Sequence, residues 1–112
     1  MRTNRVALLY NILQTFDGDI DMTLTGPVGS PLDICSDNGS STDNFTNTLL
    51  DSTCPTTIAS GSGPFTGCFS PEASFAIYNG QSGNGAWTLK VVDSAAQDTG
   101  TLASWALDVT AR

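Results

Sequence analysis

The most regular hydrophobic pattern in the chain lies near its C-terminal end, in residues 84–109. Two short segments there place apolar residues at alternate positions: Trp87, Leu89 and Val91, then Trp105, Leu107 and Val109. Period-2 alternation is typical of strands with one buried face. The sequence therefore predicts strands over 86–92 and 102–109, joined by an acidic, glycine-containing turn, with both tryptophans in the core.

The rest of the chain consists of short apolar segments separated by turn residues. Further strands are expected over 5–14, 20–25, 32–35, 45–50 and 57–60. The first of these carries apolar residues on both faces, so we expect it to be buried on both. Residues 61–73 are expected to be loop, and residues 74–78 a strand or a single helical turn. Seven or eight short strands separated by turns predict an all-β, jelly-roll-like antiparallel β-sandwich.

Length and charge restrict the class of protein. The 112 residues suffice for one domain, spanning 1–112. Eleven acidic and four basic residues give a net charge of −7, which argues against nucleic-acid binding, because that needs Lys and Arg against phosphate. No apolar run approaches the roughly 20 residues of a membrane-spanning helix. We therefore expect no nucleic-acid partner and no membrane span.

The residue types that catalysis needs are poorly represented. The chain has no histidine, so a Ser-His-Asp triad cannot be assembled from it. No cysteine has a recognisable base partner. The aspartates lie in polar, turn-like sequence, whereas glycoside hydrolysis needs one carboxylic acid with a raised pKa in a cleft. The sequence therefore predicts a protein that is not an enzyme.

Three cysteines, Cys35, Cys54 and Cys68, leave at least one thiol outside any internal disulfide. Cys54 and Cys68 both lie in loop-like sequence, and a Cys54–Cys68 disulfide is favoured over Cys35–Cys54. Three unlinked cysteines remain an alternative. Without histidine or a CxxC motif, a zinc site of the Cys/His type is not expected.

Aspartates are the candidate metal ligands. Asp17, Asp19 and Asp21 alternate, so on an extended segment their side chains would point the same way. Asp37, Asp51, Asp93 and Asp98 in later turns could add ligands. Ca²⁺ takes six to eight oxygen ligands from carboxylates and carbonyls, so it is the possible cofactor. The alternative is a solvated acidic edge with aspartates that form turns.

Eight short motifs occur in an order that is similar to one known family. They are residues 17–24, 26–30, 36–39, 43–48, 64–67, 71–72, 79–81 and 98–105. Together they resemble the P-domain (P/Homo B domain), which follows the catalytic domain of subtilisin-like proprotein convertases and occurs in bacterial secreted proteins. The resemblance covers about residues 12–110.

The resemblance implies a non-catalytic, secreted module that packs on an adjacent protease or other hydrolase domain and stabilises it. It also implies calcium in acidic loops. Two features depart from the family. Only Asp51, followed by Ser52, stands where bacterial relatives carry paired acids, and residues 1–11 leave little room for the family's additional upstream strand. Either the chain is a trimmed form, or another polypeptide supplies that strand at the open edge.

Two other functions fit a β-sandwich of this composition. One is an extracellular module that binds carbohydrate or mediates adhesion, which exposed aromatic residues in a groove would favour. The other is a structural subunit of an extracellular assembly, in which copies of the chain exchange strands. Fold alone does not choose among these functions. In every case a secretion signal is expected to lie outside this chain or to be absent.

Overall fold

A computed structural model describes residues 3–14, 17–27, 30–39, 41–93 and 100–111. These residues form strands β1 (Thr3–Gln14), β2 (Ile20–Thr25), β3 (Leu32–Ser36), β4 (Phe45–Asp51), β5 (Gly67–Phe69), β6 (Thr88–Asp93) and β7 (Gly100–Ala111). Three single-turn 3-10 helices accompany them: η1 (Asp17–Asp19), η2 (Ile58–Ser60) and η3 (Phe75–Tyr78). The predicted all-β fold class is confirmed.

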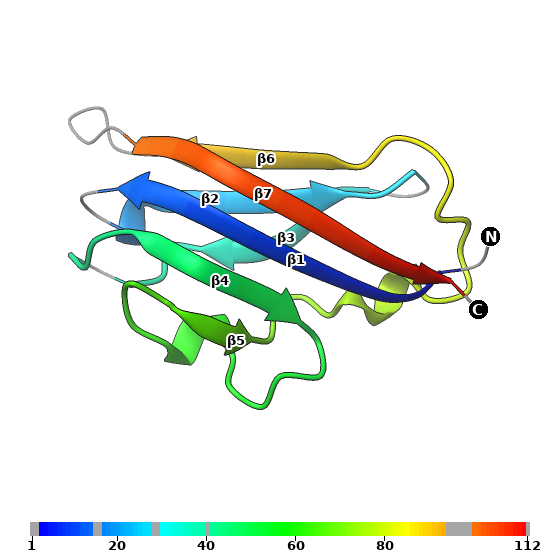
Figure 1. Cartoon of the computed structure of the whole chain (residues 1–112), viewed down its shortest axis with the longest axis horizontal. Coiled ribbons are helices and arrows are strands. Elements are labelled where there is room, and N and C mark those ends of the chain that lie inside the picture. Colours follow the sequence, from blue (N-terminus) through cyan, green and yellow to red (C-terminus); the bar gives the residue numbers. More distant parts are fainter. Residues whose placement is uncertain (1–2, 15–16, 28–29, 40, 94–99, 112) are drawn as a thin grey trace.

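The strands form two sheets that pack face to face. One sheet has four strands in the order β5-β4-β1-β7, and the other has three in the order β3-β2-β6. All neighbouring strands are antiparallel except β4 and β5, which are parallel. Figure 1 shows β1, β4 and β7 in front of β2, β3 and β6. The predicted sandwich is therefore present, with β6 and β7 in different sheets although they follow each other in the chain.

The core lies between the two sheets and follows from alternation along the strands. On β1 every second residue points inward and is buried: Val6, Leu8, Tyr10 and Ile12. Ile20, Met22 and Leu24 of β2 are buried in the same core. Fully burying an aliphatic side chain contributes about 1.5–3 kcal/mol, so these two central strands hold the sandwich together.

The first and last strands run antiparallel over their whole length. Thr3 pairs with Ala111, and Gln14 pairs with Gly100. The N- and C-terminal ends of the described chain therefore lie side by side at one end of the molecule, as Figure 1 shows.

Most of the strands predicted from the sequence are confirmed, but two segments differ. Residues 57–60 are not a strand, because Ile58–Ser60 form a 3-10 turn that buries Ile58. The predicted loop 61–73 contains β5, a three-residue strand too short to show a hydrophobic period. Residues 75–78 form a helical turn, one of the two structures expected there. The acidic turn after β6 lies in 94–99, outside the described residues.

Two predictions of burial are wrong. Trp105 shares the inward face of its strand, yet it is 42% exposed. The reason is that β7 is an edge strand, paired only with β1 among the described strands. β1 is not buried along the whole of its second face: Leu9 and Leu13 point outward and are 39% and 59% exposed, although Ala7 on that face is buried.

Candidate functional site: the outward face of the four-stranded sheet

An apolar stripe crosses the outward face of the four-stranded sheet. The strand register places Leu49 of β4 beside Leu9 of β1. Leu9 in turn lies beside Ala106 of β7, and Leu49 beside Cys68 of β5. These four residues, Cys68, Leu49, Leu9 and Ala106, are called the apolar stripe below. One residue from each strand contributes, so the stripe crosses the whole sheet.

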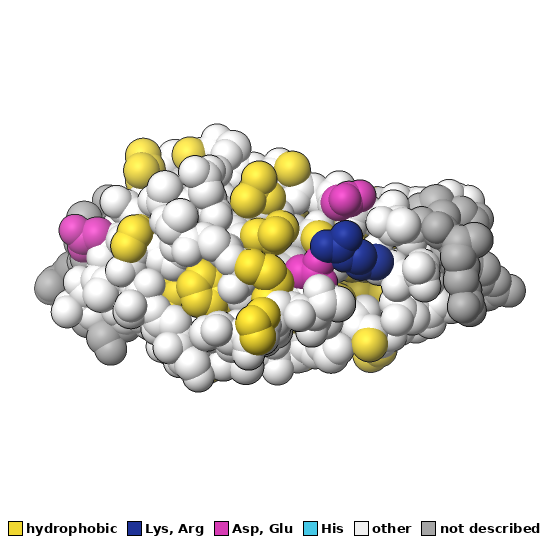
Figure 2. All heavy atoms as spheres, turned by 60° about the horizontal axis from the view of Figure 1, so that its bottom comes forward, with side chains coloured by type: hydrophobic (Ala, Val, Ile, Leu, Met, Phe, Trp, Pro, Cys, Tyr) yellow, Lys and Arg dark blue, Asp and Glu magenta, His cyan; other side chains and the backbone are white. Residues whose placement is uncertain are grey.

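The stripe is accessible to a partner. Ala106 and Cys68 are exposed, and Leu49 is half-buried. Polar residues usually occupy the solvated face of an antiparallel sheet, whereas leucines stand at two neighbouring outward positions here, Leu9 and Leu49. Figure 2 shows hydrophobic side chains in a band on this face, beside basic and acidic side chains. Contiguous exposed apolar surface on a small protein marks interaction sites.

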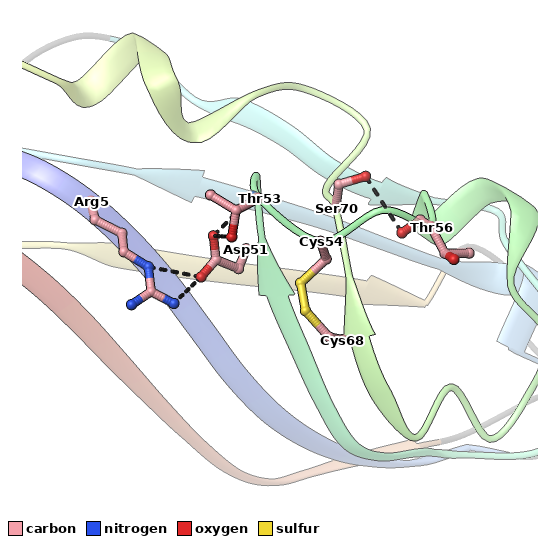
Figure 3. Close-up of a disulfide and its surroundings, with 7 residues drawn as sticks. All are labelled: Arg5, Asp51, Thr53, Cys54, Thr56, Cys68 and Ser70. Carbon is pink, nitrogen blue, oxygen red and sulfur yellow. Dashed lines mark hydrogen bonds and ion pairs between the residues drawn. A yellow bond between two sulfur atoms is a disulfide. The ribbon is translucent and has the colours of Figure 1, made fainter.

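An ion pair borders the stripe on one side. The Nε atom of Arg5 donates a hydrogen bond of 2.8 Å to Oδ2 of Asp51, and Nη2 of Arg5 donates to the same oxygen. The backbone N–H and the hydroxyl of Thr53 each donate to Oδ1 of Asp51 at 3.0 Å. Both carboxylate oxygens of this buried aspartate are therefore satisfied, as Figure 3 shows.

The environment of Asp51 keeps its carboxylate charged. Burial alone would raise the pKa of Asp51, but the hydrogen bonds from Arg5 and Thr53 outweigh burial, so the pKa lies below its usual value. Asp108, on the other side of Ala7 in the sheet, lies close enough to help raise the pKa of Arg5. A charged row thus runs parallel to the apolar stripe.

A disulfide joins Cys54 and Cys68, the pair favoured from the sequence, with their Cα atoms 5.7 Å apart. It fastens β5 to the segment after β4, and Figure 3 shows it beside the Arg5–Asp51 pair. Cys35 is a buried free thiol. Burial raises the pKa of Cys35 to about 11, so at neutral pH it is protonated and behaves as a small apolar core residue.

The predicted acidic ligands are dispersed. Residues 17–19 form a 3-10 turn rather than an extended strand, so the premise that Asp17, Asp19 and Asp21 point the same way is wrong. Asp17 is buried, Asp19 is half-buried, and Asp21 is partly exposed on β2 at a position between inward-facing residues. The 3-10 turn breaks the alternation on which the prediction rested.

The other predicted ligands lie in separate places. Asp37 follows β3 with a positive φ of 53°, Asp51 binds Arg5, and Asp93 at the end of β6 accepts a hydrogen bond of 3.1 Å from Nε2 of Gln14. Asp98 lies outside the described residues. Within the described ranges, no three His, Cys, Asp or Glu side chains are grouped so that they could hold a metal ion.

Calcium binding stays a prediction from the sequence, and a simple experiment tests it. A ligand that binds only the native state raises its melting temperature. Melting curves in excess Ca²⁺ and in chelator should therefore differ if the ion binds, and should coincide if the acids only solvate the surface.

Two of these acids have raised pKa values. Burial raises the pKa of Asp17 to about 7, although Thr42 donates a hydrogen bond of 3.2 Å to its Oδ2 and thereby opposes the shift. The Oδ1 atom of Asp17 is buried without a hydrogen-bond partner. Burial also raises the pKa of Asp21, with a further contribution from the negative charge of Asp37.

The stripe was not predicted from the sequence, because apolar residues on both faces of 5–14 indicated that this strand is completely buried. The signal that could have corrected it was Arg5, a charged residue on the same face as Leu9 and Leu13. A strand with an arginine on one face has that face near solvent.

Comparison with known proteins gives one match. The family model described as the proprotein convertase P-domain matches residues 3–109, nearly the whole chain. Neither the curated proteins nor the solved structures include a significant match. In the part of the chain that the structure describes, there is no helix of the length and hydrophobicity that crossing a membrane requires.

Proposed function

Because the chain belongs to the proprotein convertase P-domain family, whose members are non-catalytic accessory domains, we propose that it packs on a neighbouring secreted protease or other hydrolase domain and stabilises that domain. In this proposal the chain itself carries out no chemistry. Its role is to cover an apolar surface of the neighbour with one of its own.

The observation that carries the proposal is the apolar stripe on the outward face of the four-stranded sheet. Leu9 of the stripe is 39% exposed, and Leu13, further along β1 on the same face, is 59% exposed. Leaving leucine in water is unfavourable by about 25 cal/mol for each Å² of apolar surface. A neighbouring domain that covers the stripe recovers this free energy, which is how docking would stabilise both partners.

The charged row beside the stripe would orient the docked domain. Arg5 is half exposed and Asp108 is exposed, so both can contact a partner at the rim of the interface. Charges at a rim contribute mainly to specificity and to the rate of association. The apolar stripe would supply affinity, and the charged row would set the orientation.

The disulfide supports a location outside the reducing cytoplasm. Structural disulfides persist in oxidising compartments and are rare in the cytosol. The Cys54–Cys68 bond lies at the end of the stripe, so it also holds β5, the outermost strand of the proposed docking face, in place. Secretion is therefore part of the proposal.

Site-specific photo-crosslinking tests the proposal in the native protein. A photoreactive side chain is placed at Leu9 in one variant and at Val92 in another, because the two residues are 39% and 40% exposed but lie on different sheets. Crosslinks to a hydrolase domain, identified by mass spectrometry of the digested product, are expected from Leu9 and not from Val92.

Substitutions at the same two positions give an independent measurement. Leu9→Ser should lower the melting temperature of the hydrolase domain, and Val92→Ser should leave it unchanged. Equal crosslinking from both positions, or a crosslinked partner without hydrolase chemistry, would contradict the proposed function. The isolated chain should have the same stability in both variants, because each side chain is already exposed.

A further inference from the structure

Within the described ranges, no strand closes the side of the sandwich where β6 and β7 lie. Each strand is the last in its sheet, and the two are not hydrogen-bonded to each other. Among the described strands, β7 pairs only with β1, on one of its edges. Backbone N–H and C=O groups of alternate residues point to opposite edges of a strand. The other edge of β7, which is 12 residues long, therefore offers a row of donors and acceptors to a further strand.

Apolar side chains are exposed along the same side. The register with β1 pairs Leu102 with Ile12 and Trp105 with Tyr10, and both partners are buried in the core. Leu102 and Trp105 therefore face inward, yet they are 37% and 42% exposed. The open seam is defined by the inward residues of both edge strands: Leu89, Val91, Leu102, Trp105 and Leu107.

A hollow marks one end of the open seam. It has a volume of about 140 Å³ and lies between Ile12 and Ile20 of the core and Val91 and Leu102 of the edge strands. Its lining is mixed, because Asp93 and Thr101 contribute polar surface beside the apolar side chains. An apolar side chain of an added strand would enter this hollow and contact the core directly.

The charge of the molecule indicates which kind of strand would bind. Asp93 lies in the lining of the hollow, Asp108 is exposed on β7, and Lys90 is exposed on β6, so the two edge strands together carry a net charge of −1. A second copy of the chain would bring a net charge of −7 against another −7, and like charges across an interface repel. Complementarity instead favours a strand that carries lysine or arginine.

We propose that the free edge of β7 binds an extended segment of a separate polypeptide as an additional antiparallel strand. The segment has apolar residues at alternate positions, which face the open seam, and basic residues among the others. Backbone hydrogen bonds would give affinity, and the alternate side chains would give specificity, as in other β-strand additions. This site is distinct from the apolar stripe, and it does not depend on the neighbour's being a hydrolase.

A synthetic peptide of the same length as β7, 12 residues, provides the first test. It alternates valine with threonine and has lysine at both ends; a second peptide has glutamate in place of each lysine. Binding is followed by amide NMR of the labelled protein. The lysine peptide is expected to shift amides of β7 and β6. The glutamate peptide should bind more weakly, and added salt should reduce the difference because it screens the charges.

Two substitutions at exposed apolar residues locate the site. Trp105→Ser removes the largest side chain of the open seam and should weaken peptide binding by about tenfold, the equivalent of losing about 1.4 kcal/mol of buried apolar contact. Ile77→Ser is the matched control, because Ile77 is 59% exposed on η3, outside the seam. It should leave binding unchanged.

If the free peptide binds too weakly to be detected, a fused form of it tests the same site. The lysine peptide is fused after the C-terminus through a short glycine-containing turn, so that it can fold back antiparallel to β7, at an effective concentration in the millimolar range. Amide exchange in β7 should then slow by at least about tenfold relative to a fusion whose valines are replaced by serine. If exchange in β7 is the same in both fusions, the free edge does not accept a strand and the proposal is wrong.

The oligomeric state identifies the competing occupant. Sedimentation of the unfused chain should show a monomer over a wide concentration range. A concentration-dependent dimer that the fused strand dissociates would assign the edge to a second copy and overturn the proposed separate partner.

Discussion

The two lateral sides of the sandwich differ in how completely the core is covered. On the β4–β5 side, the ring of Phe65 stacks on Phe45 with centroids 4.9 Å apart, and Phe69 packs edge-on against Phe65 at 5.8 Å. The Cys54–Cys68 disulfide fastens the outermost strand there. On the β6–β7 side, inward-facing apolar residues remain exposed. Within the described residues, one side is closed by aromatic rings and a disulfide, and the other leaves inward-facing apolar side chains exposed.

The difference shows that inward orientation and burial are separate properties. Alternation along a strand decides which side chains face the core. An inward-facing residue of an edge strand is buried only if a further strand or loop covers the outer edge of that strand. Phe65 comes from a loop with no strand pattern and is fully buried. Trp105 lies in a segment with a regular strand pattern, yet it is 42% exposed.

The largest effect is expected from a substitution on the closed side. Phe65→Ala removes the ring at the centre of the aromatic cluster and should lower the free energy of unfolding by about 3–5 kcal/mol. Denaturant unfolding measures the loss. Leu13→Ala, at a side chain that is 59% exposed, is the control and should stay within about 0.5 kcal/mol of the wild type. Similar losses for both would mean that the closed side does not dominate stability.

The closed side also contains a buried acid whose titration should be visible. Asp17 has a pKa of about 7 in the folded protein, against about 3.9 in an unfolded chain. The folded state therefore holds the proton more tightly. The stabilisation is complete below about pH 4 and is lost as the pH rises through 7. Three pH units correspond to at most about 4 kcal/mol.

Asp17→Asn should flatten this pH dependence. The amide stays neutral, so unfolding curves at pH 4 and pH 8 should become more alike, and the variant should exceed the wild type in stability at pH 8. Asp43→Asn provides a directional control. The charge of Asp43 helps to raise the pKa of Asp17, so its removal should shift the wild-type transition to lower pH. An unchanged pH profile in Asp17→Asn would refute the assignment.

The disulfide should contribute a smaller amount. Its cysteines are separated by 14 positions in the sequence, and closing a loop of about that length stabilises a fold by about 3 kcal/mol. The double variant Cys54→Ser/Cys68→Ser should lose about this much in denaturant unfolding. Reductant should destabilise the wild type similarly and leave the double variant unchanged. No effect of reductant on the wild type would show that the closed side does not depend on the bond.

The sequence predicted the fold from signals that lie within single strands. Alternation located β2 and β7, and turn residues separated the strands, so the sandwich followed. What it could not predict depends on neighbours that are distant in sequence. β5 exists because three residues pair with β4. The Arg5–Asp51 pair joins residues 46 positions apart, and no local pattern links them.

The candidate site was harder to predict for the same reason. The apolar stripe arises where the register of four strands aligns one residue from each, and no segment of the chain shows that alignment by itself. The expected common direction of Asp17, Asp19 and Asp21 rested on an extended conformation, and a 3-10 turn at 17–19 takes its place. Of the predicted site residues, Cys68 belongs to the stripe, and Asp51 lies beside it in an ion pair with Arg5.

Trp105 gives the smallest expected effect, and its comparison with Trp87 contrasts an exposed position with a covered one. Trp87 precedes β6, donates from Nε1 to the carbonyl oxygen of Gly83 at 3.1 Å, and packs edge-on against Tyr78 at 5.0 Å. Trp105 is 42% exposed. Trp105→Ala should therefore cost less than about 1 kcal/mol, whereas Trp87→Ala should cost about 3 kcal/mol or more.

Repeating the measurement with the tethered strand links this comparison to the open seam. A strand that covers Trp105 makes it a buried residue, so the cost of Trp105→Ala should rise toward that of Trp87→Ala while the cost at Trp87 stays the same. A cost at Trp105 that does not change on tethering would show that the added strand leaves the seam uncovered. Trp105 would then contribute little to the stability of the isolated sandwich and nothing to binding of the added strand.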